Sequence, residues 1–87
     1  MPYEFDASDG FLLILKNTQK QNPQLYERIK KKIRQILEEP HHYKELRNAL
    51  KGCCRSQVGS FVLVFEIIES EKTVYFINFD HHDKVYG

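Results

Sequence analysis

The spacing of apolar residues along the chain changes once, from a helical period in the first half to a strand-like period in the second. Residues 3–5 predict a short first strand. The segment FLLILKNTQKQ after Asp9-Gly10 predicts a first helix, because three apolar residues in it fall at helical spacing: Phe11, Leu12 and Leu15. The chain therefore begins with a strand followed by a helix.

A second helix is predicted to begin at Asn22-Pro23. Asn22 can cap the free amides of a helix, and Pro23 fits the first helical position, where its missing N–H is not needed. An apolar stripe follows at intervals of four, four, three and one residues: Leu25, Ile29, Ile33, Ile36 and Leu37. Pro40 cannot continue a helix, so this one is expected to end at about Glu39.

From Gln57 onward the runs VGSFVLVFEII and TVYFINFDHH, joined by the polar SEK, predict a β-hairpin. Strict alternation places four residues of the first run on one face: Phe61, Leu63, Phe65 and Ile67. It leaves Val62, Val64 and Glu66 on the other face. In the second run, Tyr75, Ile77 and Phe79 alternate with Val74, Phe76 and Asn78.

The length of 87 residues predicts one domain over residues 1–87 and no second domain, and 41% hydrophobic with 29% charged residues is enough for one core. The formal net charge of +1 gives no whole-chain signal for nucleic acid. The outer face of the second helix is nevertheless basic: Arg28, Lys30, Lys31, Lys32 and Arg34. Such a face is either merely solvated or tracks phosphates.

The chain is expected to be soluble and cytoplasmic, without a membrane partner. Acidic residues stand near its start, where a secretory signal needs basic ones, and no apolar run approaches membrane-spanning length. Cys53 and Cys54 are adjacent, which predicts reduced thiols and no disulfide framework. A zinc site lacks the usual ligand spacing. His41 and His42 are interpreted as exposed loop histidines without a specific task.

The ending FDHHDKVYG concentrates groups that donate, accept or carry protons. It is compatible with a metal site, an acid–base centre or a solvated tail. If the last strand stays extended, His82 shares a face with Asn78 while His81 follows Phe79, so the two histidines point in opposite directions. That arrangement disfavours a shared metal ion and favours acid–base or phosphate-contact chemistry, or no catalysis.

Four segments together resemble the RelE/ParE toxin family over nearly the whole chain: NPQLYERIKKKIRQILEEP, KELRNALKG, the strand after VGSF, and FDHHDKVYG. The resemblance implies an α+β domain of the RelE-like fold, in the order β-α-α-β-β-β. In that fold a short N-terminal strand and a two-helix hairpin pack with a small, mostly antiparallel sheet. RelE-type members are ribosome-dependent mRNA endoribonucleases that a cognate antitoxin neutralises, whereas ParE-type members poison DNA gyrase. Fold alone does not choose between these functions.

For a ribonuclease, the resemblance implies metal-independent general acid–base cleavage without a cofactor. Attack of a 2′-hydroxyl on its phosphate needs a proton acceptor, a donor for the leaving 5′-oxygen and cations around the phosphoryl oxygens. His82 suits the acid or base role, Tyr86 can donate, orient or stack, and His81 is the weaker candidate. The RNA-binding cations implied by the family pattern are Arg47, Lys51 and Arg55, of which Arg55 also serves the catalytic site.

One position departs from the family pattern. Many ribonuclease members carry an arginine early in the first hairpin strand, where this chain has Val62. Loss of one preorganised donor costs on the order of 10²-fold or more in rate. The sequence therefore leaves two functions open, an mRNA endoribonuclease acting on the ribosome, weakened by Val62, and a non-nuclease binding protein. The second is either a ParE-like gyrase inhibitor or a degenerate member that only pairs with its antitoxin.

Both functions imply a cognate antitoxin. The predicted face away from the helices is apolar: Val62, Val64, Val74 and Phe76. An antitoxin helix or strand laid across it would bury that surface, and self-association is expected when the antitoxin is absent.

Overall fold

The computed structural model describes residues 2–43 and 53–86, and at Tyr86 the backbone only. Arg47 and Lys51, two of the predicted RNA-binding residues, lie outside the described residues. The elements follow one another as β1 (Glu4–Ala7), α1 (Asp9–Gln21), α2 (Pro23–Glu38), the 3-10 turn η1 (Pro40–His42), β2 (Cys53–Val58), β3 (Phe61–Ile68), the 3-10 turn η2 (Glu69–Glu71), β4 (Thr73–His81) and α3 (His82–Tyr86).

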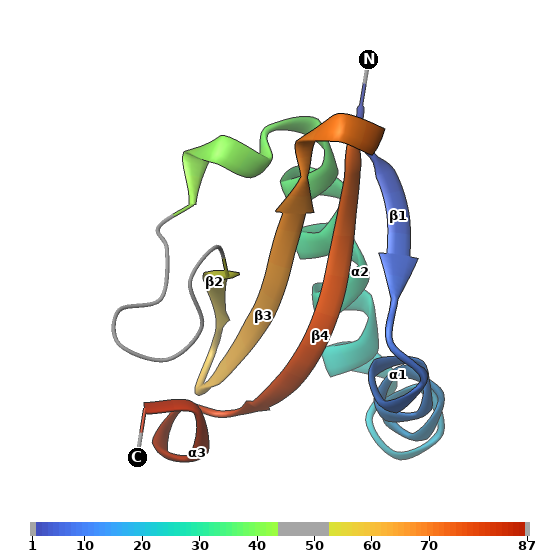
Figure 1. Ribbon diagram of the computed structural model, residues 1–87. Helices are drawn as coiled ribbons and strands as arrows, with labels where there is room; N and C mark the ends of the chain where they lie inside the picture. The colour runs from blue at the N-terminus through green and yellow to red at the C-terminus, as the bar shows by residue number, and fades with distance from the viewer. Residues whose placement is uncertain (1, 44–52, 87) are drawn as a thin grey trace.

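The strands form one sheet in the order β1-β4-β3-β2. β1 runs parallel to β4, and the other neighbouring strands are antiparallel. Helices α1 and α2 lie on one side of this sheet (Figure 1). The predicted α+β fold, with its order β-α-α-β-β-β and mostly antiparallel sheet, is confirmed. The short helix α3 is not among the predicted elements, which have this segment as the extended end of the last strand.

Side-chain caps fix where α1 and α2 begin. Asn22 Oδ1 accepts a hydrogen bond from the Leu25 amide at 3.2 Å, as its sequence position predicted. Ser8 Oγ accepts one from the Phe11 amide at 3.1 Å and thereby starts α1 at Asp9. This cap lies earlier than the predicted helix start, so the helix includes the Asp9-Gly10 pair. α2 ends at Glu38, just before Pro40, as predicted.

The apolar stripe of α2 forms the centre of the main core. Ile29, Ile33 and Ile36 are buried, and they pack with the buried Phe11 of α1. Leu25 and Leu37 are partly buried against the same cluster. Leu12 is 45% exposed although it falls within the predicted helical pattern. The helical period therefore predicted the buried residues of α2 correctly. In α1 it wrongly placed Leu12 on the buried side.

A β-bulge changes which residues of β4 face the helices. Val64 pairs with Asn78, while the next residue, Phe65, pairs with Phe76, so Ile77 is an extra residue in β4. Phe76 and Phe79 therefore both contribute to the core under the helices, although they are three positions apart. The prediction that Val74 and Phe76 lie on the face away from the helices was wrong. Both are 0% exposed in the main core.

The opposite face of the sheet has a small core of its own. Cys53, Val62 and Val64 are buried there, and Ile77 and Val85 of α3 pack against them. Val62 is 1% exposed and Val64 is 5% exposed, so neither offers the open apolar surface that was predicted for an antitoxin. Within the described ranges, no helix is long and apolar enough to span a lipid bilayer.

The β2–β3 hairpin closes through Gly59 and Ser60, between the paired residues Val58 and Phe61. Gly59 has a φ of 61°, which favours glycine in a two-residue hairpin loop. A Cβ at Gly59 would lie 3.3 Å from a terminal nitrogen of Arg28. The Arg28 guanidinium of α2 thus lies close against this turn.

Candidate functional site

The candidate site lies on the sheet face away from α1 and α2, where α3 packs. Two cross-strand rows define this face, Arg55–Val64–Asn78 and Gln57–Val62–Asp80, because directly paired residues point to the same side of a sheet. Neighbouring strands are about 4.8 Å apart, so the outer members of each row are about 10 Å apart. Val85 of α3 contacts the buried residues of these rows.

The end of β4 brings α3 back towards the β2–β3 turn. The His82 amide donates a hydrogen bond of 2.9 Å to the carbonyl oxygen of Ser60, and the chain becomes helical from His82 onward. The prediction that His81 and His82 point in opposite directions assumed an extended strand, and the strand ends between them. Both rings instead approach Asp83, with His81 Nδ1 at 3.7 Å and His82 Nδ1 at 3.5 Å from its carboxylate.

His81 and His82 differ in what surrounds them. His81 pairs with Phe61 across the sheet, and their rings meet edge to face with centroids 5.7 Å apart. Phe61 packs against the core under the helices, so His81 lies at the margin of that face. The Asp83 amide donates to His81 Nδ1 at 3.3 Å. His82 opens the helix that covers the candidate face, and Tyr86 follows one turn later in the same helix.

The charges on the candidate face are mixed. Arg55 of β2 is half-buried, and Asp80 of β4 stands in the neighbouring row, next to Val62. Asp80 Oδ1 accepts a hydrogen bond of 2.7 Å from the His81 amide. The alternation of β4 predicted Asn78 on this face but did not predict Asp80 as part of the site. A phosphate here would meet Arg55 and a carboxylate together.

Val62 occupies the middle of this face with almost no exposure. Its cross-strand neighbours are Gln57 and Asp80. The position at which the resemblance implies a cation in many ribonuclease members therefore holds an apolar side chain in the packed cluster beneath α3.

A shallow pocket adjoins Arg55 at the β2 edge of the sheet. Its volume is about 330 Å³, and it is lined by His42, Tyr43, Arg55, Ser56 and Gln57. The rings of His42 and Tyr43 meet edge to face with centroids 5.3 Å apart. Burial, and to a lesser degree Glu39, raises the pKa of the Tyr43 hydroxyl. The pocket thus joins two aromatic rings to a cation.

The two cysteines lie on opposite faces of β2. Cys54 belongs to the core under the helices and Cys53 to the core under α3, and both are buried free thiols. Burial, with a further contribution from Glu66, raises the pKa of the Cys53 thiol. A raised thiol pKa disfavours the reactive thiolate, and Cys53 packs in the smaller core as a buried side chain.

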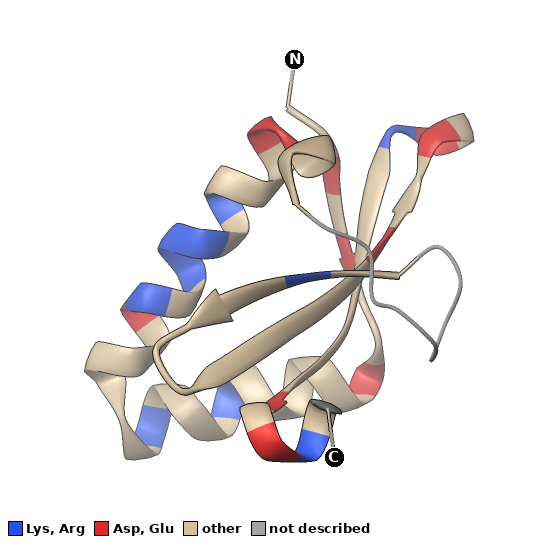
Figure 2. Ribbon diagram, turned by 90° about the vertical axis from the view of Figure 1, so that its left-hand side faces the viewer, with Lys and Arg blue, Asp and Glu red and all other residues tan. Residues whose placement is uncertain are grey.

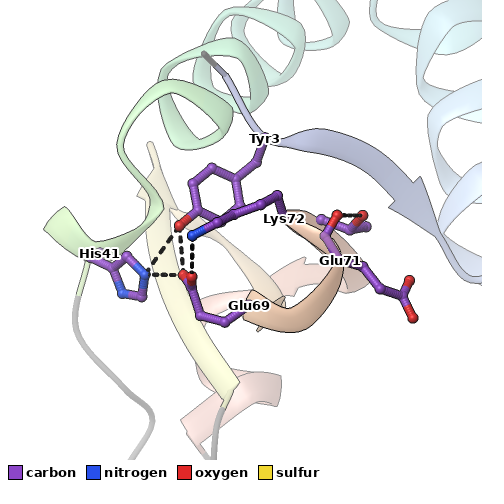
Figure 3. A network of polar contacts seen from close by, with 6 residues as sticks. Tyr3, His41, Glu69, Glu71 and Lys72 are labelled. Carbon is purple, nitrogen blue, oxygen red and sulfur yellow. Dashed lines mark hydrogen bonds and ion pairs between the residues drawn. The ribbon is translucent and has the colours of Figure 1, made fainter.

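A second polar cluster joins distant segments at the other end of the sheet (Figure 3). The carboxylate of Glu69 accepts hydrogen bonds from Tyr3 Oη at 2.5 Å and from Lys72 Nζ at 2.8 Å, and it also contacts His41 Nε2. We call Tyr3, His41, Glu69 and Lys72 the Glu69 network. His41 is exposed, as predicted, but it contacts Glu69, which the sequence did not indicate. The chain gives no local signal for these contacts, since Glu69 is 28 residues from His41 and 66 from Tyr3.

The Glu69 network shifts the proton affinities of its members. Hydrogen bonds from Lys72, Tyr3 and His41 lower the pKa of the Glu69 carboxyl from 4.5 to about 2. The hydrogen bond to Glu69 raises the pKa of Tyr3 and that of Lys72. The carboxylate is therefore kept charged and fully engaged, which suits a structural role better than catalysis.

Basic residues recur along α2 (Figure 2), and of the predicted basic face Arg28, Lys30, Lys31 and Arg34 are exposed while Lys32 is half-buried. Lys30 Nζ lies 3.8 Å from the Glu27 carboxylate and 5.3 Å from the ring centroid of Tyr26. Among the described residues, no group of three or more His, Cys, Asp or Glu side chains is arranged to hold a metal ion.

The comparisons with known proteins agree with one another. A family model described as the ParE toxin of the type II toxin–antitoxin system parDE matches residues 6–86. RelE4 of Methanocaldococcus jannaschii is 41% identical over 85 residues, which cover 97% of this chain and 90% of that protein.

Two solved structures share the architecture. The Mycobacterium tuberculosis RelBE2 toxin–antitoxin complex contains a chain that superposes with a TM-score of 0.79 at 23% identity, covering 94% of this chain and 100% of that one. A chain of the intact Escherichia coli RelBE toxin–antitoxin complex superposes with a TM-score of 0.73 at 26% identity, covering 91% and 95%.

Proposed function

The chain belongs to the ParE toxin family of type II toxin–antitoxin systems, and from this premise we propose that it is an endoribonuclease that cleaves mRNA on the ribosome. The proposal rests on one observation above all. α3, which begins with His82, packs on the same face of the sheet from which Arg55 projects. The helix that carries His82 and the strand residue Arg55 thus meet on one face of the sheet.

The proposed reaction is a transesterification within the RNA chain. A base takes the proton of a 2′-hydroxyl, the 2′-oxygen attacks the adjacent phosphorus, and an acid protonates the leaving 5′-oxygen, which yields a 2′,3′-cyclic phosphate. His82 provides one of the two proton transfers, and Tyr86 is proposed for the other or for orienting the RNA. Arg55 stabilises the charge that builds on the phosphoryl oxygens.

The pocket beside Arg55 supports RNA as the substrate. Sequence-specific RNA recognition commonly stacks unpaired bases on aromatic or histidine rings, and this pocket offers the rings of His42 and Tyr43. Arg47 and Lys51 are proposed as additional phosphate contacts. His81, at the margin of the opposite face, is proposed to position the turn through its contacts with Phe61 and Asp83, without touching the reacting atoms.

A cognate antitoxin in the cytoplasm is proposed as the protein partner. Membership of a toxin–antitoxin family supports it, and the similar E. coli chain was solved in complex with an antitoxin. The reaction as proposed uses only side chains and needs no metal or cofactor.

Val62 favours a second candidate, a binding protein without nuclease activity. The position that carries a strand cation in many ribonuclease members is apolar and packed, and Asp80 beside it disfavours a phosphate by like-charge repulsion. In this alternative the protein inhibits gyrase, or it only binds its antitoxin.

Inducible expression in a heterologous bacterium separates the candidates. Growth and newly formed mRNA 5′ ends are compared between the wild type and a His82→Ala/Tyr86→Phe variant. A His42→Ala variant, which removes one ring from the pocket beside Arg55, is measured in the same way. We expect growth arrest with cuts at in-frame positions for the wild type and neither for the double variant. Arrest without new 5′ ends supports gyrase inhibition, and a folded protein that causes neither supports a degenerate member.

A further inference from the structure

Two neighbouring leucines of α1 are exposed to solvent. Leu12 is 45% exposed and Leu13 is 59% exposed, and among the described residues the only other exposed large apolar side chain is Phe5 of β1. The opposite side of α1 faces the main core through the buried Phe11 and the partly buried Ile14. α1 therefore buries one apolar side and presents a second, smaller one to solvent.

Two charged residues lie on the same side of α1 as these leucines. Asp9 and Lys16 are both exposed, and they are seven residues apart, which is about two helical turns, so they project in nearly the same direction. Leu12 and Leu13 lie midway between them along the helix, about 50° to either side of the line that joins them. We call Asp9, Leu12, Leu13 and Lys16 the α1 stripe.

The α1 stripe is complementary to itself. A two-fold axis that crosses α1 between Leu12 and Leu13 places a second copy of the helix antiparallel to the first. Leu12 then meets Leu13 of the second copy, and Asp9 meets Lys16 of the second copy, about 5 Å along the helix from the axis. The leucines of both copies are thus enclosed between two pairs of opposite charges.

The two charges of the α1 stripe are available for such a contact. Among the ion pairs within the described ranges, none includes Asp9 or Lys16. Lys16 and Lys20 are both exposed and stand one helical turn apart, where like charges repel each other. A carboxylate from a second copy beside Lys16 would relieve this repulsion.

We propose that two copies of this chain pair through antiparallel α1 helices, with the α1 stripe as the interface. The sequence analysis expected self-association through the outer face of the sheet, where Val62 and Val64 are now seen to be buried beneath α3. The α1 stripe supplies a different surface for it. Since α1 lies on the other side of the sheet from the candidate site, both candidate sites stay accessible in the dimer.

The order of charges favours a second copy over a segment of an unrelated protein. From either end the α1 stripe presents a charge, two leucines and a charge of the opposite sign, which is the pattern that an isologous contact requires. Such a contact is closed, so it yields a dimer and no filament. One short helix from each copy makes a small interface, and we expect a dissociation constant of roughly 10–100 µM.

Sedimentation velocity of the free chain and of two charge variants tests the proposal. In Asp9→Lys, cations oppose each other at both ends of the contact, and in Lys16→Glu, carboxylates do. We expect each variant alone to dimerise at least about tenfold more weakly than the wild type. An equimolar mixture of the two variants should recover a dissociation constant within about threefold of the wild type, because each introduced charge then faces its opposite.

Recovery on mixing separates the interface from effects on folding. Asp9 lies in the first turn of α1, so Asp9→Lys also weakens the helix N-terminus, but mixing does not repair that loss. Lys31→Glu is the matched control, since it makes the same change of charge at an exposed position of α2, and it should dimerise like the wild type. Melting curves establish that every variant folds. A wild type that stays monomeric up to about 1 mM, or a mixture that associates no better than either variant alone, would overturn the proposal.

The leucines are tested separately from the charges. Leu12→Ser/Leu13→Ser should weaken dimerisation by at least about tenfold, because it removes the apolar centre of the contact. Phe5→Ser, which removes the other exposed apolar side chain, should leave the dissociation constant within about twofold of the wild type. If Phe5→Ser abolishes the dimer while the leucine variant dimerises normally, the chain associates through another surface and the α1 stripe is not the interface.

These measurements do not depend on RNA cleavage. If the protein cuts no mRNA but the mixed charge variants recover the dimer, the proposed ribonuclease activity fails and the α1 interface stands. If cleavage is confirmed while the wild type is monomeric, the α1 interface fails alone.

Discussion

The two ends of the sheet both hold histidine and carboxylate side chains, but they are organised differently. At the η2 end, Glu69 is contacted by Tyr3 and His41, which come from two distant parts of the chain, and by Lys72, which caps the same 3-10 turn (Figure 3). At the α3 end, both histidines approach Asp83, their near neighbour in sequence, at 3.5 Å or more. The Glu69 carboxylate joins distant segments of the chain. The ion pairs of the Asp83 carboxylate with His81 and His82 join residues that are adjacent or two apart in sequence.

This difference distinguishes a structural cluster from a candidate for chemistry. The Glu69 carboxylate has three hydrogen-bonding partners and a strongly lowered pKa, so it is a poor proton acceptor near neutral pH. The Asp83 carboxylate is 84% exposed and lies beyond hydrogen-bond distance of both rings. At the α3 end, the His82 backbone amide and Val85 contact the sheet, and the side chains of His81 and His82 are 47% and 52% exposed. We therefore expect the end with the closely paired side chains to be the less reactive one.

The largest difference is expected between two single alanine variants, one at each end of the sheet. His82→Ala should lower the rate of mRNA cleavage by about 10²–10⁴-fold, because it removes one of the two proton transfers. His41→Ala should leave the rate unchanged, since His41 lies at the opposite end of the sheet. Single-turnover cleavage on programmed ribosomes measures both, with melting curves as the control for folding. Equal losses in the two variants would show that the comparison of the two ends is wrong.

Placing a cation at Val62 tests whether the lack of a phosphate partner on the candidate face limits the rate of cleavage. Val62→Arg should raise the cleavage rate by on the order of 10²-fold if a missing phosphate partner limits the reaction. It should also destabilise the fold by roughly 1–3 kcal/mol, because a longer side chain enters a packed cluster.

Val64→Arg is the matched control for this substitution, since Val64 lies on the same strand and face and is 5% exposed. It should carry a similar stability cost without the gain in rate. A gain shared by both variants would indicate a nonspecific effect of positive charge on RNA binding. The assay is the same single-turnover cleavage, combined with urea unfolding.

Local patterns in the sequence were sufficient for the helices and most of the sheet. The stripe through Ile29, Ile33 and Ile36 identified the buried side of α2, and Asn22 and Pro40 marked its two ends. These features depend on residues within one helical turn of each other, so a single sequence contains the information. The resemblance of four short segments to one family supplied the topology that local patterns alone do not.

The failures share a physical cause, since each depends on a change of backbone direction or on a distant partner. The bulge at Ile77 reversed the alternation of β4 and moved Val74 and Phe76 into the main core. The turn into α3 at His82 ended the strand that the histidine prediction required. The Glu69 network needs the tertiary fold to bring its members together. For the candidate site, the sequence therefore indicated residues but not the surface they share.

Charge removal at Glu69 is expected to have the smallest effect, and its pH dependence gives the sharpest test of the network. The folded pKa of about 2 lies below the ordinary value of 4.5, so the folded state binds this proton less tightly than the unfolded state. The resulting stabilisation is fully present above about pH 4.5 and is lost as the pH falls towards 2. Glu69→Gln should therefore lower the melting temperature slightly at pH 7, and the difference from wild type should shrink on acidification.

Glu71→Gln is the matched control, because Glu71 lies in the same 3-10 turn, is exposed, and points away from the network (Figure 3). Since both side chains are exposed, solvent screening keeps either effect small. Comparing the two variants by calorimetry from pH 7 to 3 removes the general effect of deleting one negative charge. If both variants lose the same stability with the same pH dependence, Tyr3, His41 and Lys72 do not stabilise the fold through Glu69. A loss of stability that is specific to Glu69→Gln and disappears on acidification would show that the Glu69 network stabilises the fold. Catalysis would then be sought at the α3 end of the sheet.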